Sequence, residues 1–420
     1  MQSHFVSILL FFLFPRSSGA NKTSYKFLQM EQTRKLGQLE NVLANRSAIN
    51  NLIVTTILRT KDKFLDVNIL KEAVFKTIKS QPNLNSVLRR CEKNNELYFT
   101  PLKEIHDYFE ELPKNTDWRE VCIEYNNKHL RDDFETSPPI KVLFIQPSPK
   151  EAILIVVGSH YSTDGVTTST TISLILETYS ELKKNPAYKP IQQKVPRSLE
   201  DYIKQSVVSG QEFVKMNAGF VKYHLNVLDT AKCGMDFVNT PSTKEIFSYY
   251  STTESQFIQF KKVCKSRNFT LGAALCGAYA YTMARCIFTK NKNTTDLPET
   301  INLIFELPVN LRDRVVTDKE LSWKCINFMV SNPYISISVS RNSSFWEVVK
   351  NAKDAFDRLL SEDTKFYMFS SSAITEDELS AEDGKRRIDD AKLKMNGLGR
   401  HGCYSNMKTY GDFFFFFLLW

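Results

Sequence analysis

The residues best suited to chemistry are a histidine, an aspartate and a glycine within Gly158–Gly165. His160 follows the apolar run Ile153–Val157, and Asp164 and Gly165 come four and five positions after it. A buried strand would fix the backbone of the histidine, and a glycine allows the chain to turn tightly. Imidazole titrates near neutral pH and can take a proton from a hydroxyl, an amine or a thiol. The spacing therefore predicts a general base held by a strand and a turn.

A second segment, Leu307–Arg314, follows another apolar run and offers a partner cation, with Arg312 and Arg314 as neighbours that could be confused. In this order, the two segments resemble the HxxxDG and VNLR motifs of acyltransferases with the chloramphenicol acetyltransferase-like fold. That superfamily includes alcohol O-acetyltransferases, plant BAHD acyltransferases and the condensation domains of peptide synthetases.

The resemblance extends beyond these two motifs and covers about residues 31 to 412. Arg34–Glu40 is similar to the RxLGxLE opening of the alcohol acetyltransferase branch, and residues 71–84 are similar to its next helix and turn. Pro138 and Pro139 resemble the entry to the strand that pairs with the histidine strand. The opening and the arginine segment make the HxxxDG match much more specific than it is alone.

The resemblance implies an α/β (α+β) fold of two similar lobes, each with mixed sheets and helices, and an active site in the cleft between them. It implies that His160 is the general base, that Asp164 and Arg312 form a structural pair, and that Gly165 forms the active-site turn. Candidate cleft residues of the second lobe are Asn310, Asn327, Ser405 and Asn406.

Two positions depart from the family pattern. Ser159 stands where many relatives carry a second histidine, and Lys408 stands where a small residue is expected after the SN segment. A lone histidine beside a strand is more often structural than catalytic. Asp164 could also orient the imidazole, as in a nucleophilic triad.

The leading functional hypothesis is an O-acyltransferase that uses acyl-CoA as co-substrate, with a small alcohol or lipid as acceptor, no covalent acyl-enzyme and no metal. One alternative is a condensation-type domain that uses a carrier-protein thioester and an amine. Another is a non-catalytic homologue that binds a ligand or partner. We expect a monomer.

Composition narrows the class of protein. At 420 residues, with 42% hydrophobic and 24% charged residues, the chain can bury two cores and is not disordered. Its formal charge of +8 is spread along the chain, which favours a solvated surface over a nucleic-acid patch, and it would also suit an anionic carrier such as coenzyme A. The eight cysteines are scattered without metal-ligand or redox spacing, and we interpret most as free thiols.

One further motif matches in its residue pattern but not in its predicted structural context. Gly397–Gly402 matches a dinucleotide-binding fingerprint, but a charged segment precedes it and a strand-like segment follows it. The phosphate site needs a buried strand before the glycines and a helix after them. We therefore interpret this stretch as a loop.

The sequence suggests five parts. Residues 1–20 form a candidate signal peptide or a spurious N-terminal extension, 24–190 an N-terminal lobe, 191–240 a linker, 241–412 an incomplete C-terminal lobe, and 413–420 an anomalous Phe-rich tail. A signal peptide would place the protein in the secretory pathway, whereas a spurious N-terminus leaves a cytoplasmic or membrane-associated protein.

Periodicity predicts the elements around the candidate site. Strands are expected at Asn51–Arg59, Leu97–Phe99, Ile140–Ile145, Ile153–Val157, Ile246–Tyr250 and Ile301–Phe305. Helices are expected at Val67–Ser80, Val166–Lys183 and Ser255–Lys265, with a further helix beginning near Thr270 and another near residues 384–395.

Overall fold

The computed structural model describes residues 5–10, 33–37, 40–41, 43–44, 51–59, 65–91, 96–127, 138–206, 252–290, 298–315, 326–331, 333–360, 402–410 and 413–419. The chain divides into two compact units. Unit 1 contains residues 1–206, 310–330 and 407–416, and unit 2 contains residues 207–309, 331–406 and 417–420. The expected strand Ile246–Tyr250 and the expected helix near residues 384–395 lie outside the described residues.

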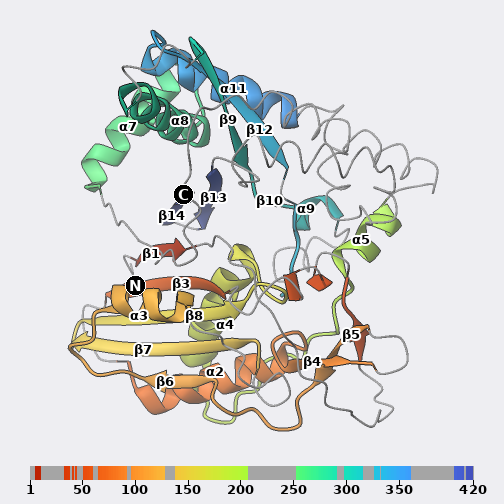
Figure 1. Cartoon of the computed structure of the whole chain (residues 1–420). Helices are drawn as coiled ribbons and strands as arrows, with labels where there is room; N and C mark the ends of the chain where they lie inside the picture. The colour runs from red at the N-terminus through yellow and green to blue at the C-terminus, as the bar shows by residue number, and fades with distance from the viewer. Residues whose placement is uncertain are drawn as a thin grey trace. The chain divides into compact units, whose positions relative to one another are not determined.

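The main sheet of unit 1 has the strand order β1-β3-β8-β7-β6 (Figure 1). Its strands are β1 (Phe5–Leu10), β3 (Asn51–Arg59), β6 (Phe109–Glu111), β7 (Ile140–Ser148) and β8 (Glu151–Ser159). Strands β1, β3, β8 and β7 pair antiparallel, and β6 lies parallel to β7. The central strand β8 is buried along almost its whole length, as its apolar run predicts.

Helices and a small second sheet complete unit 1. The helices are α2 (Val67–Ser80), α3 (Trp118–Asn127), α4 (Gly165–Lys184), α5 (Leu199–Ser206) and α9 (Arg312–Val315). The three-stranded sheet has the order β2-β5-β4, with β2 (Arg34–Lys35), β4 (Ser86–Arg90) and β5 (Leu97–Pro101). Helices α3 and α4 both contact β3 and β8. The core thus surrounds the strand that leads into the candidate base.

Helix α4 is rich in threonine, which is a weak helix former because its β-branched side chain is restricted. Its buried hydroxyls find partners in carbonyls one turn earlier: Thr168 Oγ1 donates to Asp164 O at 2.9 Å, and Thr171 Oγ1 to Thr167 O at 2.8 Å. These bonds satisfy the hydroxyls without adding helix stability, so tertiary packing of the buried threonines, rather than propensity, stabilises the helix.

Among its described residues, unit 2 combines part of a four-stranded sheet with three helices. Its elements are α7 (Glu254–Ser266), α8 (Leu271–Lys290), β9 (Thr300–Glu306), β12 (Tyr334–Ser340) and α11 (Phe345–Leu360). The sheet order is β12-β9-β13-β14, where β13 spans Gly402–Tyr410 and β14 spans Phe413–Leu419. Strand β12 pairs antiparallel with β9, and β13 is parallel to β9. Two short strands, β10 (Val309–Asn310) and β11 (Val330–Ser331), pair separately.

Predicted and observed elements agree closely. Helix α2 and strand β3 have the predicted bounds, and α7 begins after the cap Thr253, whose hydroxyl and the Gln256 side chain form a capping box. The Phe-rich stretch treated as anomalous forms β14, and the apolar N-terminal run contains β1. Some assignments differ: residues 310–330 and 407–412, assigned to the second lobe from sequence, cluster with unit 1, and the expected linker 191–240 is divided between the two units.

Helix α8 is long and apolar enough over Leu271–Thr289 to cross a membrane by length and composition alone. However, 56% of its most apolar stretch is buried inside the protein, and a core helix of a globular unit has the same composition. We therefore interpret α8 as the core helix of unit 2.

Helices α8 and α11 approach each other closely at Gly277. A Cβ atom added there would lie 2.7 Å from Val349 Cα and 3.0 Å from Val349 Cγ2. Since backbone cannot yield as a flexible side chain can, only glycine fits at this crossing.

We predict that Gly277→Ala lowers the melting temperature of the protein, with a cost of about 1–3 kcal/mol, because it forces the two helices apart. Alanine is the better helix former by about 1 kcal/mol, so propensity alone predicts the opposite sign. Thermal unfolding followed by circular dichroism distinguishes the two, and a raised melting temperature would contradict the close contact.

Candidate active site

The turn after β8 is built on one carbonyl. Ser159 O accepts the backbone N–H groups of Ser162 at 3.0 Å and Thr163 at 3.1 Å, and it also accepts both of their hydroxyls at 3.0 Å. Gly158 makes this turn possible because a Cβ atom there would lie 2.5 Å from Thr163 Oγ1. The glycine that matters sterically at this point of the turn is therefore Gly158.

His160 lies in this turn, directly after the last residue of β8, and is partly buried. Its Nδ1 is 2.9 Å from Thr163 O. A carbonyl oxygen can only accept a hydrogen bond, so Nδ1 carries the proton in this contact. In the neutral ring the lone pair is then on Nε2, which is the nitrogen that can act as a base.

The surroundings of His160 favour the neutral ring. Burial lowers the pKa of the imidazole below its ordinary value, although the Thr163 carbonyl and the charge of Asp164 act in the opposite direction. A base must be unprotonated before it can act, and this environment keeps it so at neutral pH.

The carboxylate of Asp164 has two roles: it caps helix α4, and it forms an ion pair with Arg312. Its side chain caps α4 by accepting the Thr167 N–H at 2.7 Å. It also pairs with Arg312, at 2.9 Å and 3.0 Å to its two oxygens, and accepts the Met329 N–H at 2.8 Å. The imidazole Nδ1 is bonded to a carbonyl, so a triad in which a carboxylate orients that nitrogen does not describe this site.

Arg312 is completely buried, and its guanidinium is the centre of a dense hydrogen-bond network. Nη1 donates to Asn310 Oδ1 at 2.9 Å. Nη2 donates to Asp164, to Thr167 Oγ1 at 2.7 Å and to the Asn327 carbonyl. The predicted Asp164–Arg312 pair is therefore present, with the predicted arginine and with distances in the range of a charge-assisted bond.

Asn327 belongs to the same network and lies fully inside unit 1. Its side-chain oxygen accepts from Asn83 Nδ2 at 2.7 Å and from Arg34 Nη2 at 3.4 Å, and its Nδ2 donates to Arg197 O at 2.6 Å. Arg34 is held by a bidentate pair with Glu40 at 2.7 Å and 2.8 Å. The RxLGxLE opening thus reaches the ion-pair network through one amide.

The remaining predicted site residues differ in placement. Gly165 begins α4 and is buried. Asn310 is exposed, and its oxygen accepts the Arg312 N–H at 3.2 Å as well as the guanidinium. Ser405 and Asn406 lie on β13, whose side chains are outside the described part of the chain.

Asn327 needs a correction. The sequence suggested a cleft residue of the second lobe, but the structure shows a fully buried residue of unit 1 whose side chain is bonded on both ends. The physical reason is that the segment around Asn327 supplies carbonyl and amide groups to the buried ion pair.

Sequence reasoning missed several residues of the site. Thr163, Thr167 and Phe328 contact the imidazole or the ion pair, yet Thr163 is an unspecified position of HxxxDG and the other two belong to no motif that we recognised. A threonine-rich helix start directly after the DG pair was the available signal for Thr167. Nothing in the sequence pointed to Phe328.

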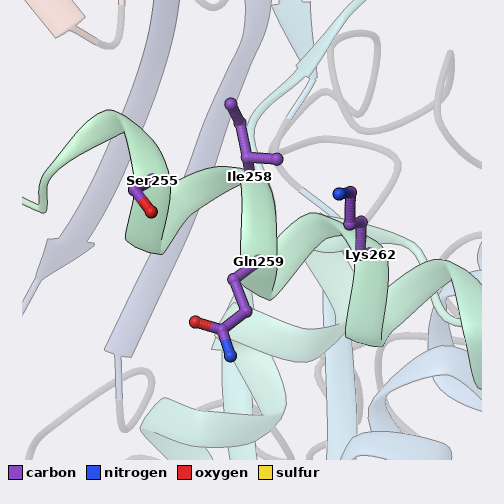
Figure 2. A pocket seen from close by; sticks show the side chains of 4 residues that line it. All are labelled: Ser255, Ile258, Gln259 and Lys262. Carbon is purple, nitrogen blue, oxygen red and sulfur yellow. The ribbon is translucent and has the colours of Figure 1, made fainter.

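A separate hollow lies along one side of α7, and Figure 2 shows the residues that line it: Ser255, Ile258, Gln259 and Lys262. Their spacing of three and four positions places them on one helix face. None of them is a predicted site residue. Among the residues that the structure describes, no group of three His, Cys, Asp or Glu side chains gathers as a metal site.

Comparison with solved structures identifies the architecture. A trichothecene 15-O-acetyltransferase from Fusarium sporotrichioides superposes with a TM-score of 0.60 at 12% identity, covering 84% of this chain and 77% of that one. A first condensation domain of the calcium-dependent antibiotic synthetase gives 0.58 at 10% identity, covering 84% and 78%. The polyketide synthase associated protein 5 from Mycobacterium tuberculosis gives 0.54 at 15% identity, covering 80% and 75%.

The chain has the chloramphenicol acetyltransferase-like fold. The expected fold is thereby confirmed, whereas neither protein-family models nor curated proteins match the sequence. At such low identity the likeness concerns the fold alone. The expected position of His160 in a cleft between the lobes stays a prediction.

In this chloramphenicol acetyltransferase-like fold, we predict that Asp164→Asn lowers stability by about 3–5 kcal/mol, because it leaves the buried Arg312 charge without its counter-ion. Denaturant unfolding measures the loss. Asp107→Asn is the matched control: Asp107 pairs with Lys141 in the same unit but is 67% exposed, so its loss should be within about 1 kcal/mol. Equal effects of the two variants would contradict a stabilising role of the buried pair.

Proposed function

We propose that this chain is an acyltransferase that moves an acyl group from a thioester to the hydroxyl of an alcohol, with His160 as the general base. One observation carries the proposal. The imidazole donates Nδ1–H to the Thr163 carbonyl at 2.9 Å, and this tautomer presents Nε2 as the basic nitrogen.

The chemical step follows from this tautomer. The acceptor oxygen attacks the thioester carbonyl while Nε2 takes the hydroxyl proton, so that a C–O bond forms and the O–H bond breaks. Collapse of the tetrahedral intermediate breaks the C–S bond, and the imidazolium returns the proton to the leaving thiolate. The products are an ester and a thiol, and His160 is neutral again.

The turn supports both halves of this cycle. When Nε2 is protonated, the Nδ1–H bond to Thr163 O stabilises the positive charge, as does the carboxylate of Asp164 nearby. The partial burial that lowers the pKa works in the other direction and favours release of the proton. These opposing effects suit a group that must both take and return a proton.

Acyl-CoA is the thioester that we propose, and a small alcohol or lipid is the acceptor. Support comes from the resemblance of Arg34–Glu40 to the alcohol acetyltransferase opening and from the likeness in fold to an O-acetyltransferase. The same fold occurs in condensation domains, so a carrier-protein thioester with an amine acceptor is the second candidate. A non-catalytic binding homologue is the third.

We predict that His160→Ala lowers turnover by about 10²–10⁴-fold and leaves acyl-CoA affinity nearly unchanged, because the imidazole acts in proton transfer. His160→Asn is the sharper variant. An asparagine amide can donate to Thr163 O from near the position of Nδ1, yet it has no basic nitrogen. It should therefore retain the stability of the wild type and show the same loss of turnover, as measured by thiol release and by thermal unfolding.

The pair of variants separates a structural from a chemical role. Full activity in either variant would exclude His160 as the base. Recovery of activity in His160→Asn but not in His160→Ala would show that the bond to Thr163, and not the proton transfer, is what the site needs.

The pH profile gives an independent prediction. Since the pKa of His160 is lowered from its ordinary value of 6.5, the base form persists at neutral pH and is lost only as the pH falls through that lower value. We expect kcat/KM to be flat at neutral pH and to decline with a midpoint below 6.5. A midpoint above 6.5 would contradict the buried environment of the ring.

The donor and acceptor are tested together. Acyl-CoA thioesters of increasing chain length and acyl-pantetheine on a carrier protein are each offered with a set of alcohols and amines, and ester or amide formation is followed by mass spectrometry. Ester from acyl-CoA supports the leading proposal, and amide from the carrier-bound donor supports the condensation alternative. No transfer from any donor by the wild-type chain favours the non-catalytic homologue.

A further inference from the structure

Three consecutive residues, 327–329, each contact a different part of the candidate active site. The Asn327 carbonyl accepts from Arg312 and from Thr167 Oγ1, the latter at 2.6 Å. The Met329 N–H donates to Asp164 Oδ2 at 2.8 Å. Phe328 lies between these two anchored residues, so its backbone has little freedom to move.

The ring of Phe328 is in contact with the ring of His160. The ring centroids are 5.5 Å apart and the planes meet at 69°, which is an edge-to-face arrangement. Phe328 is only 1% exposed, and the side chain of the preceding Asn327 is held by Asn83 and Arg34. A fully buried ring with an anchored backbone is a fixed wall for its neighbour.

Two of the described contacts of His160 bear on the orientation of the imidazole. The bond from Nδ1 to Thr163 O holds one nitrogen, but changes in the torsion angles χ1 and χ2 of His160 could still rotate the plane of the ring. The edge-to-face contact with Phe328 restricts this rotation, because the ring cannot turn without losing contact or overlapping the phenyl group. Tilting of the imidazole would move Nε2, the nitrogen that must meet the acceptor proton.

We propose that Phe328 is a positioning residue for His160: its ring holds the imidazole plane so that Nδ1 stays on the Thr163 carbonyl and Nε2 keeps the lone pair. This inference rests on the proposed function for its catalytic consequence, but the tautomer itself can be measured without turnover. It assigns a role to a residue outside the HxxxDG and VNLR segments.

The charged groups next to the turn, Asp164 and Arg312, do not hold the plane of the imidazole as the contact with Phe328 does. Asp164 from the start of α4 is paired with Arg312 from α9; its charge raises the pKa of the imidazole but does not fix the plane of the ring. The apolar phenyl ring adds to the partial burial that lowers the pKa of the imidazole. Loss of the ring should therefore change both the tautomer and the protonation of His160.

The test uses the full chain with ¹⁵N-labelled histidine, in which Nδ1 and Nε2 resonances report tautomer and protonation for each of the six histidines. The His160→Asn spectrum assigns the His160 signals by their absence. In the wild type, we expect the His160 shifts to show the Nδ1–H form. In Phe328→Leu, we expect a mixture of both neutral forms and a titration midpoint closer to the ordinary value of 6.5.

Phe144→Leu is the matched control. Phe144 is also fully buried in unit 1, but its ring contacts Phe109, and it lies in the middle of β7 opposite Leu154 of β8. It makes the same chemical change and a similar cavity, so it should lower stability as Phe328→Leu does and leave the His160 signals unchanged.

Kinetics provide the second measurement. Phe328→Leu should lower kcat by roughly tenfold or more while the KM for the thioester changes little, because only the position of the base is altered. Unchanged His160 signals in a folded Phe328→Leu variant would overturn the positioning role. Altered signals in a chain without any transferase activity would support the positioning role and refute the proposed function, so the two failures are distinguishable.

Discussion

A buried ion pair holds the candidate site together. Asp164 and Arg312 come from positions 148 residues apart, and both side chains are almost completely removed from solvent. Burying such a pair is costly unless every remaining donor and acceptor is bonded. Here the carboxylate also caps α4 and accepts a backbone N–H, and the guanidinium also reaches an amide oxygen, a hydroxyl and a carbonyl. These partners come from three separate stretches of the chain, around Thr167, Asn310 and residues 327–329, so the pair brings these segments together next to the histidine.

The position of the His160 ring depends on this ion pair, although the carboxylate does not bond to the imidazole as it would in a catalytic triad. Asp164 ends the turn that contains His160 and begins the helix that follows it, so its anchoring fixes the turn at one end, while β8 fixes the other. Within the turn, carbonyl oxygens do the orienting: Ser159 O collects four donors, and Thr163 O takes the Nδ1–H of the base. Asp164 therefore supports the backbone of the turn, and the Thr163 carbonyl sets the tautomer. In a serine protease, a single carboxylate orients the histidine and sets its tautomer.

The segment 326–329 connects the beginning of the chain to the site. Arg34 and Glu40 form a nearly buried bidentate pair, and Arg34 also reaches the amide of Asn327, whose carbonyl and next two residues contact Arg312, His160 and Asp164 in turn. The clustering of residues 310–330 with unit 1 follows from these contacts. A mutation near position 34 can therefore influence the base through packing and hydrogen bonds alone, which links the RxLGxLE opening physically to the HxxxDG turn.

The sequence by itself predicted the local elements, the Asp164–Arg312 pair and the fold, and His160 as the base is a proposal that rests on it. Helical spacing of apolar residues predicted α2, which buries one face, and continuous apolar runs predicted β3 and β8, which are buried along most of their length. The family motifs predicted the Asp164–Arg312 pair. Tertiary structure alone decided the rest. Asn327 became a buried structural residue, Thr163 set the tautomer of His160, and Phe328 came into contact with its ring. Such contacts carry no local period, because they depend on how segments distant in sequence pack, and one-dimensional patterns record only which residues are apolar.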